Sequence, residues 1–227
     1  MKRITLLLLL LTLVFTGCPS ALFTALYVLG KKDEPPRYDI LSGKEEKRIA
    51  VVPRAVFANS YELQNAPQEI ARHVNNILVD PSKTKNKKLK VVEQSKVEKW
   101  LDDCNNDFDT FLEVGRDKSI KADIVIGFDV VGFQIRDPRN AYLLQGKCEV
   151  QVTAVDCATG KILAKETLSI VEPPNMPLPI NDPRDEPMFR QEFVEVIAQQ
   201  IAALFHHHDR EKLKRIDADN VSRQRLQ

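Results

Sequence analysis

The sequence predicts an α+β fold, an α/β sandwich in which helices pack on a mixed sheet, with the element order β-α-β-α-(α)-β-β-β-α. In the first half of the chain, short apolar runs alternate with segments of helical period. This order builds parallel strands with crossover helices. Three β-rich segments then follow one another with short links, which favours antiparallel pairing. A final amphipathic segment is expected to lie on the sheet.

The first strand is predicted in "RIAVVP", residues 48–53, because a short apolar run ended by proline is typical of a strand buried on both faces. The first helix follows in residues 65–80, where apolar side chains recur at helical spacing. Asn65 and Gln68 form a capping-box pattern at its start, and Asp80-Pro81 ends it.

The second strand is predicted in "LKVVEQ", and a second helix is expected to begin at Ser95 as its cap. One face of that helix is apolar and includes Trp100, so we assign Trp100 to the core before any ligand-stacking role. A further helix is predicted in "DTFLEVGRDKSIKA", after a turn at Asn105-Asn106. The apolar face of the second helix consists of Val97, Trp100, Leu101 and Cys104.

Three consecutive strands are predicted in residues 122–137, 141–156 and 161–171. Between the last two lies "CATGK", a tight turn in which Gly160 can take a positive φ. The Pro-rich residues 172–187 are expected to cross the surface without regular structure. The last helix is predicted in "MFRQEFVEVIAQQIAALF".

The amino terminus has the three parts of an export signal: Lys2 and Arg3, an apolar run, and small residues before a cysteine. "FTGC" resembles the lipobox of bacterial lipoproteins, with Phe15 in place of the usual leucine. The resemblance implies cleavage before Cys18 and attachment of lipid to Cys18. The alternative is an uncleaved span over Ile4–Leu29, which is long enough to cross a membrane but contains Pro19.

These features divide the chain into four parts. Residues 1–17 are a signal peptide, and residues 18–47 are a lipidated apolar segment and linker. Residues 48–206 form the α/β envelope domain, and residues 207–227 form a charged tail. Within the second part, residues 21–29 either add apolar contacts with the membrane or pack on the domain.

The element order, with "KRIAVVP" at its start and "EVGRDKSIKADIVIG" before the three strands, resembles a bacterial envelope domain. This domain is shared by the curli-secretion lipoproteins, the lipoprotein activators of penicillin-binding proteins and the amino-terminal domain of TolB. The resemblance covers residues 48–205, and none of the matching positions is catalytic in that family. It implies a binding module that faces the periplasm, and it names no substrate.

A search for catalytic and metal motifs finds no G-x-S-x-G, P-loop, G-x-G-x-x-G or H-E-x-x-H. We therefore predict no catalytic residues, no cofactor and no metal site. His206, His207 and His208 are adjacent, so on a helix their side chains point about 100° apart and cannot close on one ion. They are interpreted as a solvated helix end. His73 is interpreted as a boundary or surface residue.

Asp129 is the carboxylate that we single out. An acid within the apolar run "IGFDVVGF" must be paired, exposed or functional. Other acid pairs, Asp102 with Asp103 and Asp129 with Asp156, would need a cleft to act on sugars. Cys148 and Cys157 are too far apart along one strand to form a disulfide. Buried free thiols are favoured for these two and Cys104, although pairing of Cys104 with either stays open.

Lysine and arginine number 33 and aspartate and glutamate 32, so the charge balance does not indicate a nucleic-acid partner. The one concentrated charge, "KTKNKKLK", is interpreted as a solvated loop. The function predicted is a non-enzymatic, lipid-anchored adaptor or regulator that faces the periplasm and binds another envelope protein. The outer membrane is favoured over the inner membrane as its location. The alternatives are a subunit of a secretion pore and an uncharacterised periplasmic enzyme.

Overall fold

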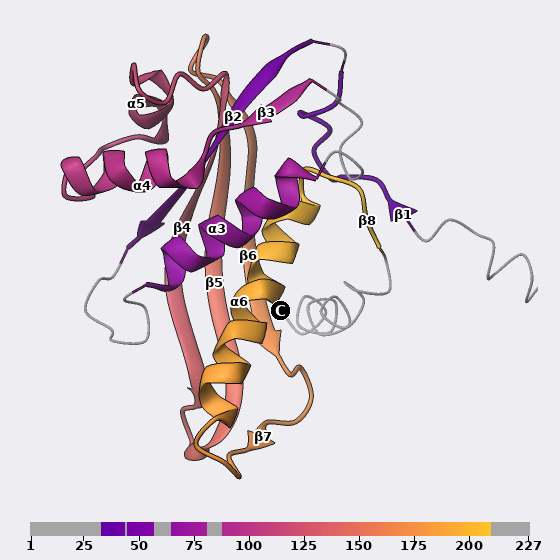
Figure 1. The fold of residues 1–227 in the computed structure, drawn as a ribbon. Coiled ribbons are helices and arrows are strands. Elements are labelled where there is room, and N and C mark those ends of the chain that lie inside the picture. The colour runs from indigo at the N-terminus through magenta and orange to yellow at the C-terminus, as the bar shows by residue number, and fades with distance from the viewer. Residues whose placement is uncertain (1–32, 44, 57–64, 81–87, 210–227) are drawn as a thin grey trace, which may run out of the picture. The chain divides into compact units, whose positions relative to one another are not determined.

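The protein is described from a computed structural model, which covers residues 33–43, 45–56, 65–80 and 88–209. The chain divides into two compact units, Met1–Asp33 and Glu34–Gln227. The larger unit is a mixed sheet with helices packed on it, which confirms the predicted fold class (Figure 1). The predicted signal peptide, Cys18 and residues 21–29 lie outside the described residues.

The sheet has the strand order β3-β2-β4-β5-β6, and β7 pairs with β5 outside this path. Strand β2 runs parallel to β3 and β4, whereas β4, β5 and β6 form an antiparallel meander, as predicted. The strands are β1 (Asp33–Glu34), β2 (Lys47–Ala55), β3 (Leu89–Val91), β4 (Ile124–Asp137), β5 (Asn140–Asp156), β6 (Ile162–Glu172), β7 (Leu178–Pro179) and β8 (His208–Asp209).

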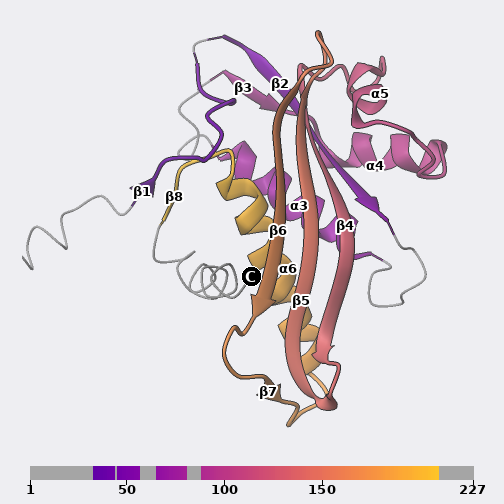
Figure 2. The ribbon, with the colours of Figure 1, turned by 180° about the vertical axis from the view of Figure 1, so that it is seen from behind.

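The helices form two layers on the sheet. Helices α3 (Ala66–Val79) and α6 (Asp185–Ala203) cover one face, and α4 (Gln94–Asp103) and α5 (Phe111–Arg116) lie on the other (Figures 1 and 2). None of the helices in the described ranges is long and apolar enough to cross a membrane.

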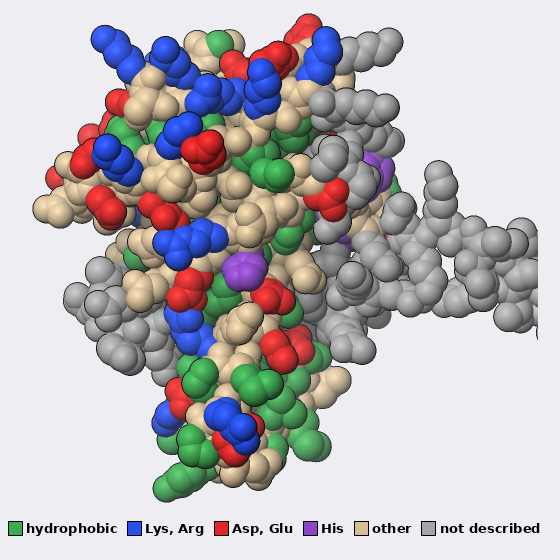
Figure 3. All heavy atoms as spheres, viewed as in Figure 1, with side chains coloured by type: hydrophobic (Ala, Val, Ile, Leu, Met, Phe, Trp, Pro, Cys, Tyr) green, Lys and Arg blue, Asp and Glu red, His purple; other side chains and the backbone are tan. Residues whose placement is uncertain are grey.

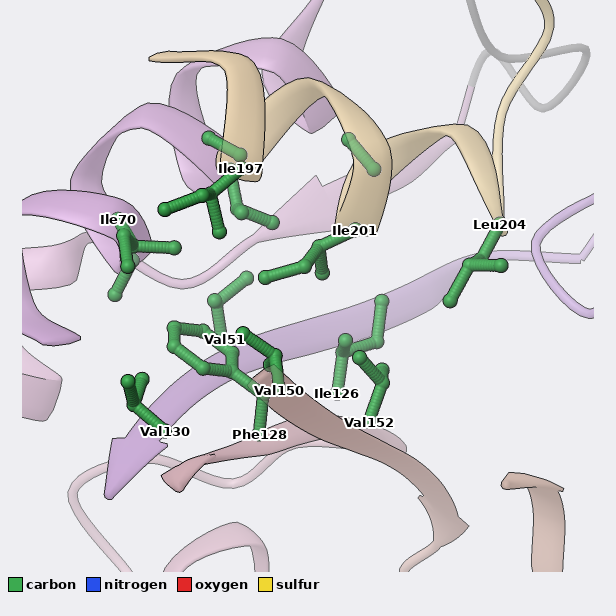
Figure 4. Close-up of a cluster of buried hydrophobic side chains, with 14 of the residues drawn as sticks. Val51, Ile70, Ile126, Phe128, Val130, Val150, Val152, Ile197, Ile201 and Leu204 are labelled. Atoms are coloured by element: carbon green, nitrogen blue, oxygen red, sulfur yellow. The ribbon is translucent and has the colours of Figure 1, made fainter. Parts of the chain in front are cut away.

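The larger core lies between the sheet and the α3–α6 layer. Strand residues such as Val51, Phe128 and Val150 point toward Ile70 of α3 and Ile197 of α6 (Figure 4). All five side chains are fully buried. Alternate residues of a strand face the same side of the sheet, so every second residue of β4 and β5 points its side chain into this core.

The second face of the sheet is covered only in part. Helices α4 and α5 pack over β2 and the first half of β4, where Ile124 to Phe128 are all buried. On β5 and β6 the corresponding face is polar and exposed: Gln151 lies opposite Thr167, and Glu149 lies opposite Ser169. In Figure 2 this face of the two strands is turned toward the viewer, with α3 and α6 behind it. An exposed sheet face with polar side chains is typical of antiparallel strands.

Two glycines of the "EVGRDKSIKADIVIG" stretch let α5 approach the sheet closely. A Cβ on Gly127 would lie 2.3 Å from Cγ of Phe111, and a Cβ on Gly115 would lie 2.4 Å from Sγ of Cys157. Asp123 joins the start of β4 to β2, because its Oδ2 accepts a 2.7 Å hydrogen bond from the backbone N–H of Arg48. These motif residues therefore serve packing.

Packed structure begins before the predicted domain start at residue 48. Leu41 is 2% exposed within the larger core, and Tyr38 and Ile40 pack against that core. The Nζ of Lys47 donates a 2.9 Å hydrogen bond to the carbonyl oxygen of Ile40. The charged residues on either side of "YDIL" gave this segment the composition of a linker, although its apolar side chains fill space beside the sheet.

The predicted turns between elements are confirmed, but the predicted helix caps are not. Asn105 and Asn106 both have a φ of 57°, and Gly160 has a φ of 73°, as the predicted turns require. The predicted capping box at Asn65 is wrong, because the Asn65 side chain makes no cap hydrogen bond. Helix α4 begins at Gln94, one residue before the predicted cap Ser95.

Candidate interaction surface

Asp129 forms an ion pair with Arg54 of the neighbouring strand β2. The Nε of Arg54 lies 2.5 Å from Oδ1 and its Nη2 lies 3.2 Å from Oδ2, and the Asp129 side chain is 14% exposed. The guanidinium carbon lies 4.9 Å from the ring centre of Phe111 and 5.3 Å from that of Phe108. Of the three alternatives for Asp129, paired, exposed or functional, the structure therefore shows the paired one.

The other carboxylates considered from the sequence have local roles or face solvent. Asp156 lies at the β5–β6 turn, where its Oδ1 accepts hydrogen bonds from the backbone N–H and the hydroxyl of Thr159 at 2.7 and 2.8 Å. These bonds hold the pKa of Asp156 below its usual value. Asp102 and Asp103 are exposed at the end of α4.

The interpretation of the three histidines as a solvated helix end is wrong. Helix α6 ends at Ala203, and the chain turns so that His206 is 4% exposed. The Nε2 of His208 lies 3.6 Å from Oε2 of Glu34. His73 is half-buried. Within the described part of the chain, no group of three or more His, Cys, Asp or Glu residues could hold a metal ion.

The three cysteines in the described residues are free thiols. Cys148 and Cys157 are buried, and burial raises the pKa of both, that of Cys157 to about 11. A thiol with a raised pKa holds little of the reactive thiolate at neutral pH. These thiols fit packing positions, as the sequence favoured.

Large apolar side chains are exposed together at the end of the sheet where β4 turns into β5. Four of them define what we call the hairpin-end surface: Tyr142, Met176, Leu178 and Met188, with exposed fractions of 79%, 75%, 47% and 61%. Figure 3 shows hydrophobic side chains gathered at this lower end, over the start of α6 and β7. Contiguous exposed apolar residues mark interaction sites in many proteins.

Backbone pairing holds the Pro-rich segment against the hairpin. Leu143 and Leu144 of β5 pair with Pro179 and Leu178 of β7. The N–H of Ile180 donates a 3.0 Å hydrogen bond to the carbonyl oxygen of Tyr142. Because β7 is bonded to the sheet, the backbone at Tyr142 and Leu178 is held in place.

The start of α6 is tied to the same end. The Oδ2 of Asp185 accepts hydrogen bonds from the N–H groups of Asn181 and Asp182 at 2.8 and 2.9 Å. Arg136 of β4 pairs with Glu186, with 3.2 Å between Nε and Oε1. Met188 lies one turn further on, so it is held beside the hairpin.

The sequence did not predict this surface. Residues 172–187 were expected to lack regular structure, but they contain β7 and the first residues of α6. A usable signal was present, since Met176 and Leu178 are large apolar residues between prolines, where a solvated loop would carry polar side chains. Tyr142 gave no such signal. The alternation of apolar and polar residues in β5 does not show which apolar residues the helices leave uncovered.

The sequence matches no protein-family model and no curated protein. Among solved structures, the chain is similar to lipoprotein GNA1162 from Neisseria meningitidis, with 15% identity, a TM-score of 0.42, and coverage of 69% of this chain and 98% of that one. It is also similar to a PelC dodecamer subunit from Paraburkholderia phytofirmans, with 10% identity, a TM-score of 0.40, and coverage of 76% and 94%.

A third similar structure is the LpoB C-terminal domain from Salmonella enterica, with 14% identity, a TM-score of 0.33, and coverage of 56% of this chain and 84% of that one. The similar structures thus include a lipoprotein. Identities and TM-scores this low transfer no activity, substrate or partner to the chain.

Proposed function

We propose that the protein is a non-enzymatic, lipid-anchored component of the cell envelope that binds another envelope protein through the hairpin-end surface. The observation that carries the proposal is the set of four exposed apolar side chains, two of which, Tyr142 and Leu178, lie where β5 pairs with β7. A rigid apolar surface loses little conformational entropy on binding. The "FTGC" sequence supports the anchor and the compartment.

The start of the larger unit and the hairpin-end surface lie at opposite ends of α6. Glu34, where the amino-terminal segment joins the larger unit, lies beside His208 after the end of α6. Met188 lies in the first turns of the same helix. A helix rises about 1.5 Å per residue, so about 22 Å separates Met188 from the last residue of α6. The amino-terminal segment that would carry the anchor therefore joins the larger unit at the end of α6 that is farther from the hairpin-end surface.

The anchor is tested by Cys18→Ser in intact cells. The wild-type protein is expected to incorporate labelled palmitate, whereas the variant should carry no label and should migrate as a precursor larger by the 17 leader residues. The reason is that serine has no thiol for the lipid, and the leader is cut only from the lipidated form. Palmitate labelling and gel mobility of both proteins measure this. Absence of label from the wild-type protein would rule out the lipid anchor.

The binding surface is tested by a photo-crosslinking residue, benzoylphenylalanine, in place of Tyr142 in the full-length protein. We expect a discrete adduct of higher mass in irradiated cells. The matched control places the same residue at Ile162, which is 55% exposed at the other end of the sheet, where the β5–β6 turn leads into β6. Equal adducts from both positions, or none from position 142, would contradict binding through this surface.

A further inference from the structure

We propose that the partner contacts the hairpin-end surface with an apolar site bordered by carboxylates. This inference rests on the proposed function and specifies the chemistry of the partner. It comes from the ion pairs that lie at the same end of the sheet as the four apolar side chains. In each pair the arginine is more exposed than its acid, so guanidinium groups face outward at this end.

Arg139 and Asp137 form the clearest of these pairs. Nε and Nη2 of Arg139 lie 3.2 and 3.0 Å from the two carboxylate oxygens of Asp137, and the Arg139 backbone N–H adds a bond of 2.9 Å. The Arg139 side chain is 80% exposed and that of Asp137 is 3% exposed. Hydrogen bonds from Arg139 also lower the pKa of Asp137. The acid is therefore enclosed, and the Nη1 group of Arg139 is left out of the pair.

Arg184 and Asp182 repeat the arrangement beside the start of α6. Nε and Nη2 of Arg184 lie 2.9 and 3.0 Å from the oxygens of Asp182, and the backbone N–H of Arg184 lies 2.9 Å from Oδ1. The Arg184 side chain is 83% exposed, and that of Asp182 is 42% exposed. The Nη1 group of Arg184 is again outside the pair.

The remaining acids at this end are committed to groups of the same chain. Asp185 accepts two backbone N–H groups, and Glu186 pairs with Arg136. In the Arg136 pair, too, the arginine is the more exposed member, at 43% against 30%. The acids are thus occupied by donors of this chain, whereas Arg139 and Arg184 keep outward N–H donors. Carboxylates match the fork geometry of guanidinium and form charge-assisted hydrogen bonds with it.

The charge balance favours a protein over an anionic lipid surface. Residues 136–142 and 176–188 together contain three arginines (Arg136, Arg139 and Arg184) and four acids (Asp137, Asp182, Asp185 and Glu186). Attraction to an anionic membrane depends on an excess of basic charge acting over a Debye length, and this end has none. Contacts at hydrogen-bond distance depend instead on which groups face outward, and these are guanidinium groups.

The test uses the full-length protein with benzoylphenylalanine at position 142 in intact cells, combined with Arg139→Glu and Arg184→Glu. We expect the yield of the protein adduct to fall about tenfold or more, since like charges would then oppose each other across the contact. Arg139→Lys with Arg184→Lys should retain part of the yield. The matched control, Lys96→Glu with Lys99→Glu on α4, makes the same change in net charge elsewhere and should leave the yield unchanged.

The crosslinked peptide of the partner then decides the chemistry. We expect Asp or Glu close to the crosslink, and changing those acids to Lys should restore the adduct with the Arg→Glu variant, which also shows that the variant is folded. An adduct that persists through both arginine reversals would overturn this inference and leave the proposed function standing. An adduct with lipid or with a second copy would overturn it too. If the protein that keeps both arginines gives no adduct from position 142, the proposed binding surface itself is contradicted.

Discussion

Replacing Phe193 by alanine is expected to lower the free energy of unfolding by about 3–5 kcal/mol, the range for large aromatic truncations in a packed core. Phe193 is fully buried on α6. Its ring centre lies 5.5 Å from that of Phe133 and 6.2 Å from that of Phe189, and the ring rests against Gly146 of β5. Truncation leaves a cavity where α6 meets the long β4–β5 hairpin. Urea denaturation of the purified protein measures the loss.

The matched control for this variant is Gln191→Ala, which changes an exposed residue two positions earlier on the same helix. It should alter the free energy of unfolding by less than about 0.5 kcal/mol, as surface substitutions do. Because the cavity lies beneath the hairpin end, Phe193→Ala should also reduce the adduct yield from position 142. A loss for Phe193→Ala no larger than that for Gln191→Ala would show that α6 does not pack on the sheet as described.

Replacing Gly127 by alanine is expected to lower the free energy of unfolding by about 3 kcal/mol, the upper part of the range for overpacking. The added methyl group would lie 2.3–2.5 Å from three ring atoms of Phe111, far inside van der Waals contact. Phe111 is buried and packs with Phe108, so its ring has little room to move. Helix α5 must therefore shift away from β4. Urea denaturation, with the exchange of the α5 amides, measures both effects.

Gly132→Ala on the same strand is the control, because a Cβ there meets no atom within 4 Å. We expect it to be neutral or slightly stabilising. Combining Gly127→Ala with Phe111→Leu should recover part of the loss, since a smaller side chain makes room for the methyl group. Equal effects of the two glycine substitutions would indicate a backbone cause and would contradict a close approach of α5 to the sheet.

Local patterns were sufficient to predict most of the elements. The helical spacing of apolar residues in 65–80 and the β-rich segments before and after Gly160 predicted α3, β5 and β6 close to their observed bounds. Such periods predict helices and strands well because each element must turn one apolar face to the core. This requirement produces a repeat of apolar residues within a short stretch of the sequence. The order of elements then restricted the topology, since crossovers and short links favour different pairings.

The sequence also predicted that Asp129 is paired, exposed or functional, but it did not decide between these alternatives or name a partner. Arg54 is 75 residues away along the chain and becomes its neighbour only because β2 and β4 pair in one register. Leu41 is a similar case. Its short apolar segment lies among charged residues, and only packing beside the sheet distinguishes it from a linker.

What the sequence by itself determined is the fold class, the element order, the turns at Asn105-Asn106 and Gly160, and the expectation of a lipidated Cys18, which lies outside the described residues. The tertiary structure decided which apolar residues remain uncovered. Tyr142 and Met188 belong to different elements, and they lie at the same end of the sheet because β7 pairs with β5 and the Pro-rich segment returns the chain to the hairpin before α6 begins. A surface made from separate segments depends on long-range pairing, which local periodicity does not encode.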